Sequence, residues 1–300
     1  MKTHNQFSRK EFLTSLAAMA GMMMVPGTIA ASPFQRRVKP RVKFGMVTYL
    51  WGKDWNLPTL IDNLTKAEVY GVELRIGHAH GVNVGMSKDQ RKEVRKMFKD
   101  SKVEVLGIGT PLRLDHPDQS VLRETIDQAR ECILLSNDIG GSGIRLQPNQ
   151  FHADVPKSRT VDQIGRALNQ LARIGAGVGQ QIRLEVHGEE TQEIDIIKDI
   201  MDVADHPNAT VCWNSNPQDL NGRGLAGNFN LLRSRMGDIA HVRELNDPSY
   251  PYGDLVRLFV EMNYKGWILL EGRTDPSDKV EALIAQRKIF EEMVEKAIIL

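Results

Sequence analysis

Short apolar runs alternate with amphipathic stretches along the chain from residue 42 onward. Each run has the length of a buried strand, and each following stretch repeats apolar residues at helical spacing, as Leu60, Ile61 and Leu64 do. The expected strands are 42–47, 71–76, 103–108, 143–147, 182–187, 209–213, 239–245 and 267–271. The expected helices are 58–69, 87–101, 118–137, 161–175, 191–204, 254–262 and 278–297, whereas residues 217–235 are Gly- and Asn-rich and only briefly helical.

This order of elements predicts a parallel sheet, because strand-then-helix units follow one another with no two strands in succession. Eight such units in roughly 260 residues match a closed (β/α)8 TIM barrel, so we expect a single domain over residues 42–300. An open doubly wound sheet is the alternative. No G-x-G-x-x-G follows the first strand, which leaves the dinucleotide-binding version of that fold without support.

Polar residues gather where the expected strands end, and the fifth strand shows this best. Glu185 and His187 lie two residues apart on the apolar run that begins at Ile182, so they share one face of the strand. In a barrel, reacting groups gather at these carboxyl ends. The same spacing recurs at Glu73 and Arg75, Arg145 and Gln147, His241 and Arg243, and Glu271 and Arg273.

Four residues from strands five to eight form a candidate metal site: Glu185, Asn214, His241 and Glu271. Carboxylate and amide oxygens with one imidazole suit Mn²⁺, Mg²⁺ or Co²⁺ and accept Zn²⁺. The alternative is a structural network of ion pairs at the barrel mouth, because such networks also bring charged residues together without a catalytic role. That network joins arginines and glutamates: Arg75, Arg145, Arg243 and Arg273 with Glu73, Glu185, Glu244 and Glu271.

The motifs at the strand ends resemble those of the sugar phosphate isomerase/epimerase family, the xylose isomerase-like TIM barrels. They are G-V-E-L-R at 71–75, L-E-V-H-G at 184–188, H-V-R-E-L at 241–245 and L-L-E-G at 269–272, and the resemblance covers residues 42–297. The family holds a divalent metal with Glu, Asp, His and a second Glu. Glu185, His241 and Glu271 match this pattern, but Asn214 stands where the family has aspartate. The site therefore loses one negative charge, and we expect weaker metal binding.

The resemblance implies an isomerase or epimerase that moves a proton next to a carbohydrate carbonyl through a metal-stabilised enediolate. Glu185 and Glu271 would be its acid/base pair, with His187 assisting. The expected partner is a small-molecule carbohydrate, contacted by Glu73, Arg75, Arg145, Trp51 and Arg243. Two alternatives stay open: a lyase or hydratase acting on keto-glycosides, and a non-catalytic carbohydrate-binding barrel with a degenerate metal site.

Composition narrows the class of protein only slightly. A hydrophobic content of 41% and a formal net charge of +1 are those of an ordinary globular protein. No basic run interleaves with aromatic residues, so we expect no nucleic-acid partner. Cys132 and Cys212 lack metal-type spacing and are interpreted as small buried hydrophobes, with their pairing left open. The sequence does not decide the oligomeric state.

The N-terminus has the features of an export signal rather than of the fold. A positive segment with Arg9 and Lys10 precedes the apolar stretch 12–25, which is too short for a membrane span, and Thr28-Ile-Ala30 supplies a cleavage site. Ser8-Arg-Lys-Glu-Phe-Leu13 is similar to the twin-arginine motif. We therefore predict a signal peptide at 1–31, a linker at 32–41 and a periplasmic mature protein. The alternative is a helix that the mature protein retains.

Overall fold

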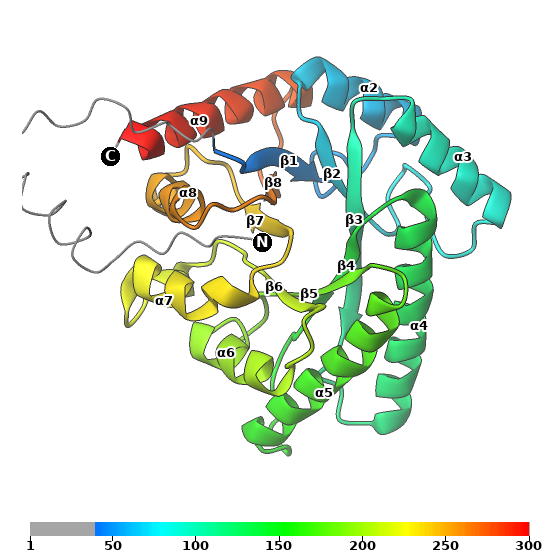
Figure 1. The fold of residues 1–300 in the computed structure, drawn as a ribbon, viewed down its shortest axis with the longest axis vertical. Helices are drawn as coiled ribbons and strands as arrows, with labels where there is room; N and C mark the ends of the chain where they lie inside the picture. Colours follow the sequence, from blue (N-terminus) through cyan, green and yellow to red (C-terminus); the bar gives the residue numbers. More distant parts are fainter. Residues whose placement is uncertain (1–39, 300) are drawn as a thin grey trace, which may run out of the picture. The chain divides into compact units, whose positions relative to one another are not determined.

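A computed structural model describes residues 40–299 of the chain. Its eight parallel strands form one sheet in the order β6-β5-β4-β3-β2-β1-β8-β7, with helices around the outside (Figure 1). The (β/α)8 barrel predicted from the sequence is therefore confirmed. The strands are β1 Lys43–Val47, β2 Gly71–Arg75, β3 Glu104–Arg113, β4 Gly143–Gln147, β5 Gln181–Glu185, β6 Ala209–Cys212, β7 Ile239–Val242 and β8 Trp267–Leu270.

The helices form where the apolar spacing and the capping residues predict them. In α2, the buried residues Leu57, Leu60 and Leu64 recur every three or four positions and face the sheet. Ser87 and Gln90 exchange hydrogen bonds in the expected capping box before α3. The helices are α2 Leu57–Ala67, α3 Lys88–Lys99, α4 Gln119–Ile139, α5 Lys157–Ala176, α6 Ile194–Val203, α7 Gly224–Leu232, α8 Tyr252–Glu261 and α9 Lys279–Ile299.

Strand β3 is longer than the predicted 103–108. It extends to Arg113, and its pairing with β2 shifts register after Val72. Gly107, which lies at this irregularity, has φ +150°. Such an irregularity locally disrupts the ladder of hydrogen bonds. The extension carries β3 beside the end of β4, where Leu114 N–H donates to the Gln147 carbonyl at 3.3 Å.

The barrel closes weakly between β6 and β7. Two isolated bridges join these strands within residues 40–299, Val211 to Met236 and Asn214 to His241. The His241 N–H donates to the Trp213 carbonyl at 2.7 Å, and the Gly237 N–H donates to the Val211 carbonyl at 2.8 Å. Asn214 and His241, both predicted metal ligands, therefore face each other across this seam.

A packed layer fills the barrel below the strand ends. It contains Val47, Leu106, Cys212, Ile239, Trp267 and Leu269. Several of these residues lie two positions before a polar site residue along the chain, so the apolar and the polar side chains both point into the barrel. Arg183 is fully buried in the same region, where it donates to the Leu106 carbonyl at 3.0 Å. This packed layer therefore closes the inner end of the site.

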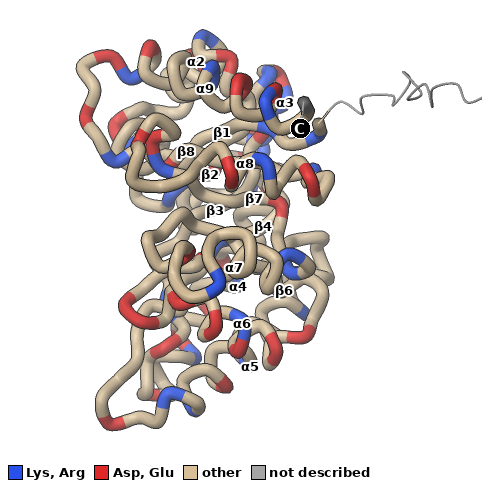
Figure 2. The backbone as a smooth tube through the Cα atoms, turned by 90° about the vertical axis from the view of Figure 1, so that its left-hand side faces the viewer, with Lys and Arg blue, Asp and Glu red and all other residues tan. Residues whose placement is uncertain are grey.

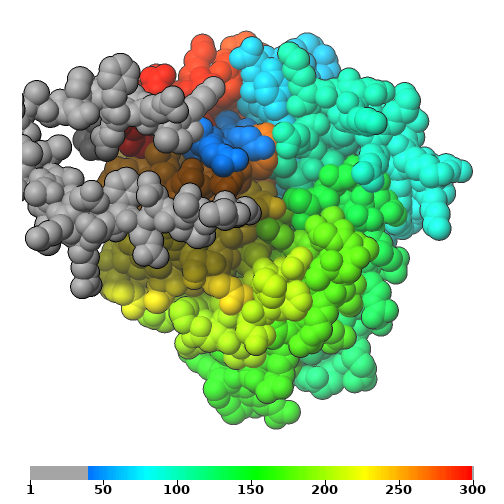
Figure 3. Space-filling view, in the orientation of Figure 1, coloured from blue at the N-terminus to red at the C-terminus, as the bar shows by residue number. Residues whose placement is uncertain are grey.

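Basic and acidic residues are interspersed along the described part of the chain, without a long segment of one sign (Figure 2). The first half of the barrel, coloured cyan to green, presents a continuous wall in the space-filling view (Figure 3). Cys132 and Cys212 are both buried and free. Within residues 40–299, no helix is long and apolar enough to cross a membrane. The predicted signal peptide and most of the linker lie outside the described residues.

Candidate active site and metal site

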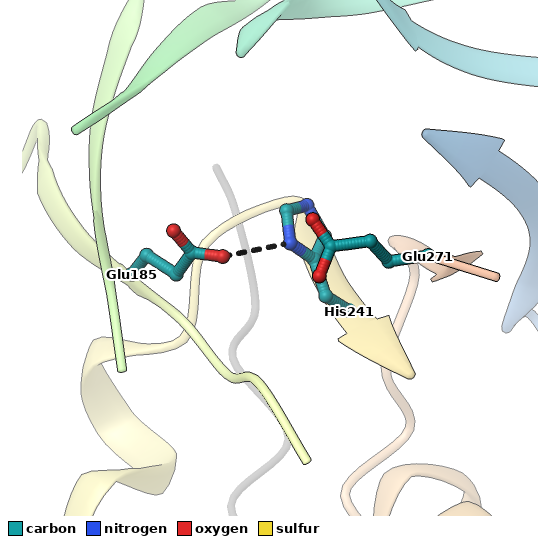
Figure 4. Close-up of side chains that lie close together, drawn as sticks. All are labelled: Glu185, His241 and Glu271. Carbon is teal, nitrogen blue, oxygen red and sulfur yellow. Dashed lines mark hydrogen bonds and ion pairs between the residues drawn. The ribbon is translucent and has the colours of Figure 1, made fainter. Parts of the chain in front are cut away.

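Three of the four predicted metal ligands meet inside the barrel mouth. Glu185 ends β5, His241 lies on β7 and Glu271 directly follows β8. Each offers one ligand atom, and these atoms all lie within 4.8 Å of one another. Figure 4 shows the carboxylates of Glu185 and Glu271 entering from opposite sides, with the His241 ring beside them. All three side chains are buried.

Hydrogen-bond donors surround the Glu185 carboxylate on both oxygens. Oε2 lies 3.0 Å from Arg145 Nη1 and accepts from Gln147 Nε2 at 3.1 Å. Oε1 accepts from Asn214 Nδ2 at 3.2 Å and lies 3.3 Å from His241 Nδ1. A carboxylate has about four lone-pair sites. Glu185 is therefore fixed in place by four neighbours.

Glu73 and Arg145 form a second, deeper part of the site. Arg145 Nε lies 3.6 Å from Glu73 Oε1, and His241 Nε2 is also 3.6 Å from that oxygen. Neither Glu73 oxygen has a hydrogen-bond partner among the described residues, and the same holds for Arg145 Nε and His241 Nε2. Gly109 makes room for this pair, because a Cβ there would lie 2.5 Å from Glu73 Oε1 and 3.0 Å from Arg145 Nη2.

The electrostatics of the site favour the ionised forms of Glu185 and Glu73. Burial alone raises the pKa of Glu185, but Arg145 and His241 outweigh it and hold that pKa below its usual range. Burial also raises the pKa of Glu73, which His241 and Arg145 lower on balance. Burial lowers the pKa of His241, whereas the carboxylates of Glu73 and Glu185 beside the ring raise it well above its ordinary value. The carboxylates beside the imidazole therefore favour its protonated form.

The residues present fit a divalent ion. Two carboxylates and an imidazole are an accepted ligand set for several metals of this kind. Asn214 reaches the same cluster through its bond to Glu185, and its Oδ1 is buried without a hydrogen-bond partner among the described residues. This oxygen could be a neutral fourth ligand, at the position where the resemblance predicts a charged aspartate.

The remaining predicted site residues surround the cluster at different depths. His187 is half-buried, burial lowers its pKa, and its Nδ1 has no hydrogen-bond partner among residues 40–299. Arg75 lies half-buried over the Tyr49 ring at 4.9 Å, and Arg243 is also half-buried. Trp51 is buried and donates its indole N–H to the Thr274 carbonyl at 2.9 Å. Its ring packs on Gly272, beside Glu271.

The network of ion pairs expected as the alternative is present only in part. Arg145 pairs with Glu185 and Glu73, and Arg273 Nη2 lies 3.8 Å from Glu271 Oε2. Arg75 and Arg243 form no ion pair within the described part of the chain. Arg145 differs from the other three arginines of this predicted network, because its side chain is fully buried below the barrel mouth. It therefore lies among the buried acidic residues and not at the solvent-exposed rim of the barrel.

Sequence reasoning did not assign roles to Gln147 or Gly109. Gln147 donates to Glu185, and its position two residues after Arg145 on an apolar run was the available sign. Gly109 was not identifiable, because its role depends on how close two side chains from neighbouring strands approach it.

Comparison with known proteins supports the assignment of the fold and gives it a family. The model of the xylose isomerase-like TIM barrel family matches residues 61–293, and the chain belongs to this family. A search of curated protein sequences finds no significant match.

Several solved structures share the fold at low sequence identity. One is 3-keto-D-glucoside 4-epimerase from E. coli, in its apo form, with a TM-score of 0.72, 13% identity, and coverage of 85% of this chain and 100% of that chain. Another is an L-ribulose 3-epimerase, with a TM-score of 0.72, 14% identity, and coverage of 85% and 95%. The IOLI protein with a bound zinc atom matches with a TM-score of 0.70, 14% identity, and coverage of 85% and 98%.

Proposed function

We propose that this chain is a sugar isomerase or epimerase that moves a proton on the carbon next to a carbohydrate carbonyl. The observation that carries the proposal is the placement of Glu185 and Glu271 on opposite sides of one buried cluster (Figure 4). Two carboxylates that flank a carbon can remove a proton from one face and return one to the other. The names of the structural neighbours, two of them sugar epimerases, agree with this chemistry.

The two glutamates are held differently, which suggests different roles. Glu185 contacts four neighbours, whereas Glu271 forms one ion pair among the described residues, with Arg273 at 3.8 Å. Glu271 therefore has the freer oxygens for proton transfer, and Glu185 is the more rigid partner. His187, two residues after the end of β5, is the residue that would donate to a substrate oxygen.

Glu185, His241, Glu271 and Asn214 Oδ1 are the residues that would hold a divalent ion. When bound there, such an ion polarises a carbonyl oxygen and stabilises the negative charge that develops on it. The zinc in the IOLI structure agrees with a metal site in this family. The expected site of action is the periplasm, which stays a prediction.

The experiment is deuterium exchange from D₂O, followed by NMR on a panel of ketoses and keto-glycosides, with and without EDTA. We expect deuterium at the carbon next to the carbonyl of an active substrate. Glu271→Gln should slow this exchange by about 10²- to 10⁴-fold, the usual contribution of a general acid or base. Glu104→Gln is the matched control, because Glu104 begins β3 at the opposite end of the barrel and its side chain is 60% exposed.

Equal exchange in the wild type, Glu185→Gln and Glu271→Gln would show that the proposed chemistry is wrong. Sugar binding without any exchange would instead support the non-catalytic carbohydrate-binding barrel. Asn214, which weakens the ligand set, is the observation that favours this second function.

A further inference from the structure

The interior of the barrel holds a permanent cation in contact with a predicted metal ligand. Arg145 projects inward from β4 and is fully buried. Its Nη1 lies 3.0 Å from Glu185 Oε2 and donates to the Thr110 carbonyl at 3.0 Å. A guanidinium stays charged at any pH that a protein tolerates. Glu185 therefore already has a positive partner before any metal binds.

A divalent ion and Arg145 draw on the same carboxylate. Glu185 already makes four polar contacts, about as many as a carboxylate can accept, so a bound ion must displace at least one of these neighbours. If Arg145 is displaced, its guanidinium keeps the Thr110 carbonyl and a more distant approach to Glu73, at 3.6 Å. If Arg145 stays, it lies on the same carboxylate as the ion and repels it. Both arrangements weaken metal binding.

We propose that Arg145 is a built-in cation that competes with a divalent ion for Glu185 and keeps the affinity of this site for metal low. This inference rests on the metal site of the proposed function. It adds a second cause to the neutral Asn214, and it makes the metal an exchangeable component rather than a permanent one. In this role Arg145 is a positioning residue, because it acts on the metal through Glu185.

The experiment is a titration of the purified protein with Mn²⁺, in which EPR measures the free ion. Arg145→Gln should bind Mn²⁺ about 10- to 100-fold more tightly than the wild type, because it removes the repulsion between the guanidinium and a divalent ion on the same carboxylate. Arg145→Lys keeps the charge and should stay nearer to the wild type. Arg183→Gln is the matched control, because Arg183 is an equally buried inward arginine that bonds to the Leu106 carbonyl and Ser142 Oγ instead of a site carboxylate.

A double variant keeps the test valid if Arg145→Gln leaves the buried charge of Glu73 with His241 alone beside it and the protein does not fold. Glu73→Gln with Arg145→Gln removes both partners, so the net charge of the site does not change. We expect this variant also to bind Mn²⁺ more tightly than the wild type, because Glu185 is released.

Unchanged or weaker binding in Arg145→Gln and in the double variant would overturn the role of Arg145, and so would an equal gain in Arg183→Gln. The proposed enzyme function would survive that result, since the exchange experiment tests it separately. Absence of Mn²⁺ binding in every variant would overturn both this inference and the metal part of the proposed function.

Discussion

Gly188 joins the loops that carry the open end of the site. It directly follows His187 and has φ +101°, a conformation that favours glycine. A Cβ at this position would collide with the Asn149 carbonyl oxygen and with Thr191 Oγ1. Thr191 Oγ1 lies 2.9 Å from the Asn149 carbonyl oxygen and 3.0 Å from the His187 carbonyl oxygen, and its one hydroxyl proton is available to either. The loop after β4 and the loop after β5 thus meet at a glycine.

Gly188→Ala should therefore be strongly destabilising. We expect a loss of roughly 2–4 kcal/mol in the free energy of unfolding, from the left-handed backbone and the steric overlap together. Gly179→Ala is the control, because Gly179 has φ +69° with no atom within 4 Å of its missing Cβ, and it should cost about 1 kcal/mol. Urea unfolding measures both, and equal losses would refute the loop contact as the cause.

The sequence predicted which residues meet but not how deep each one lies. Glu185, His241 and Glu271 were identified because strand periodicity fixes the inward face and the barrel brings the strand ends together. The depth of Arg145 depends on Gly109 in the neighbouring strand and on the register between β3 and β4, which shifts after Gly109. A one-dimensional pattern does not contain that register, so Arg145 was placed at the mouth with the other arginines.

At the scale of elements, the seam between β6 and β7 differs from the other strand contacts. Strands β4 and β5 pair along four consecutive residues, from Gly143 with Gln181 to Leu146 with Leu184. Strands β6 and β7 are joined by isolated bridges. The periodic pattern predicted the strands on both sides of the seam, but it carries no information on how completely two neighbours pair.

This seam should open more readily than the rest of the barrel. We expect the seam amides of Gly237, His241 and Ser215 to exchange with solvent roughly tenfold faster or more than the ladder amides between β4 and β5. Their hydrogen bonds lie in a region with fewer paired neighbours, where local opening costs less free energy. Residue-resolved hydrogen exchange measures this difference. Equal protection in the two regions would mean that side-chain packing, rather than strand pairing, sets the stability of the seam.

At the scale of the whole molecule, a buried acid links the segment after β6 to the start of α8. Asp219 is fully buried in the 3-10 helix Pro217–Leu220. Its Oδ2 accepts from the Tyr250 hydroxyl at 2.6 Å and from the Asn216 N–H at 2.9 Å, while Oδ1 has no partner among the described residues. Burial raises the pKa of Asp219 to about 7, although the bonds from Tyr250 and Asn216 act in the opposite direction. The folded protein therefore binds this proton more tightly than the unfolded chain does.

The sign of the resulting pH dependence follows from this difference. Because the folded pKa lies above the unfolded value, the contribution of Asp219 to stability is fully present below about pH 4 and is lost as the pH rises through about 7. A shift of about 3 units corresponds to roughly 4 kcal/mol. Asp219→Asn removes the titration, so its free energy of unfolding should rise relative to the wild type as the pH increases from 4 to 7. Urea unfolding at each pH measures the difference, with Asp62→Asn on the surface of α2 as the control. A constant difference across this range would show that Asp219 is ionised in the folded protein, and that its unpartnered oxygen tolerates the charge.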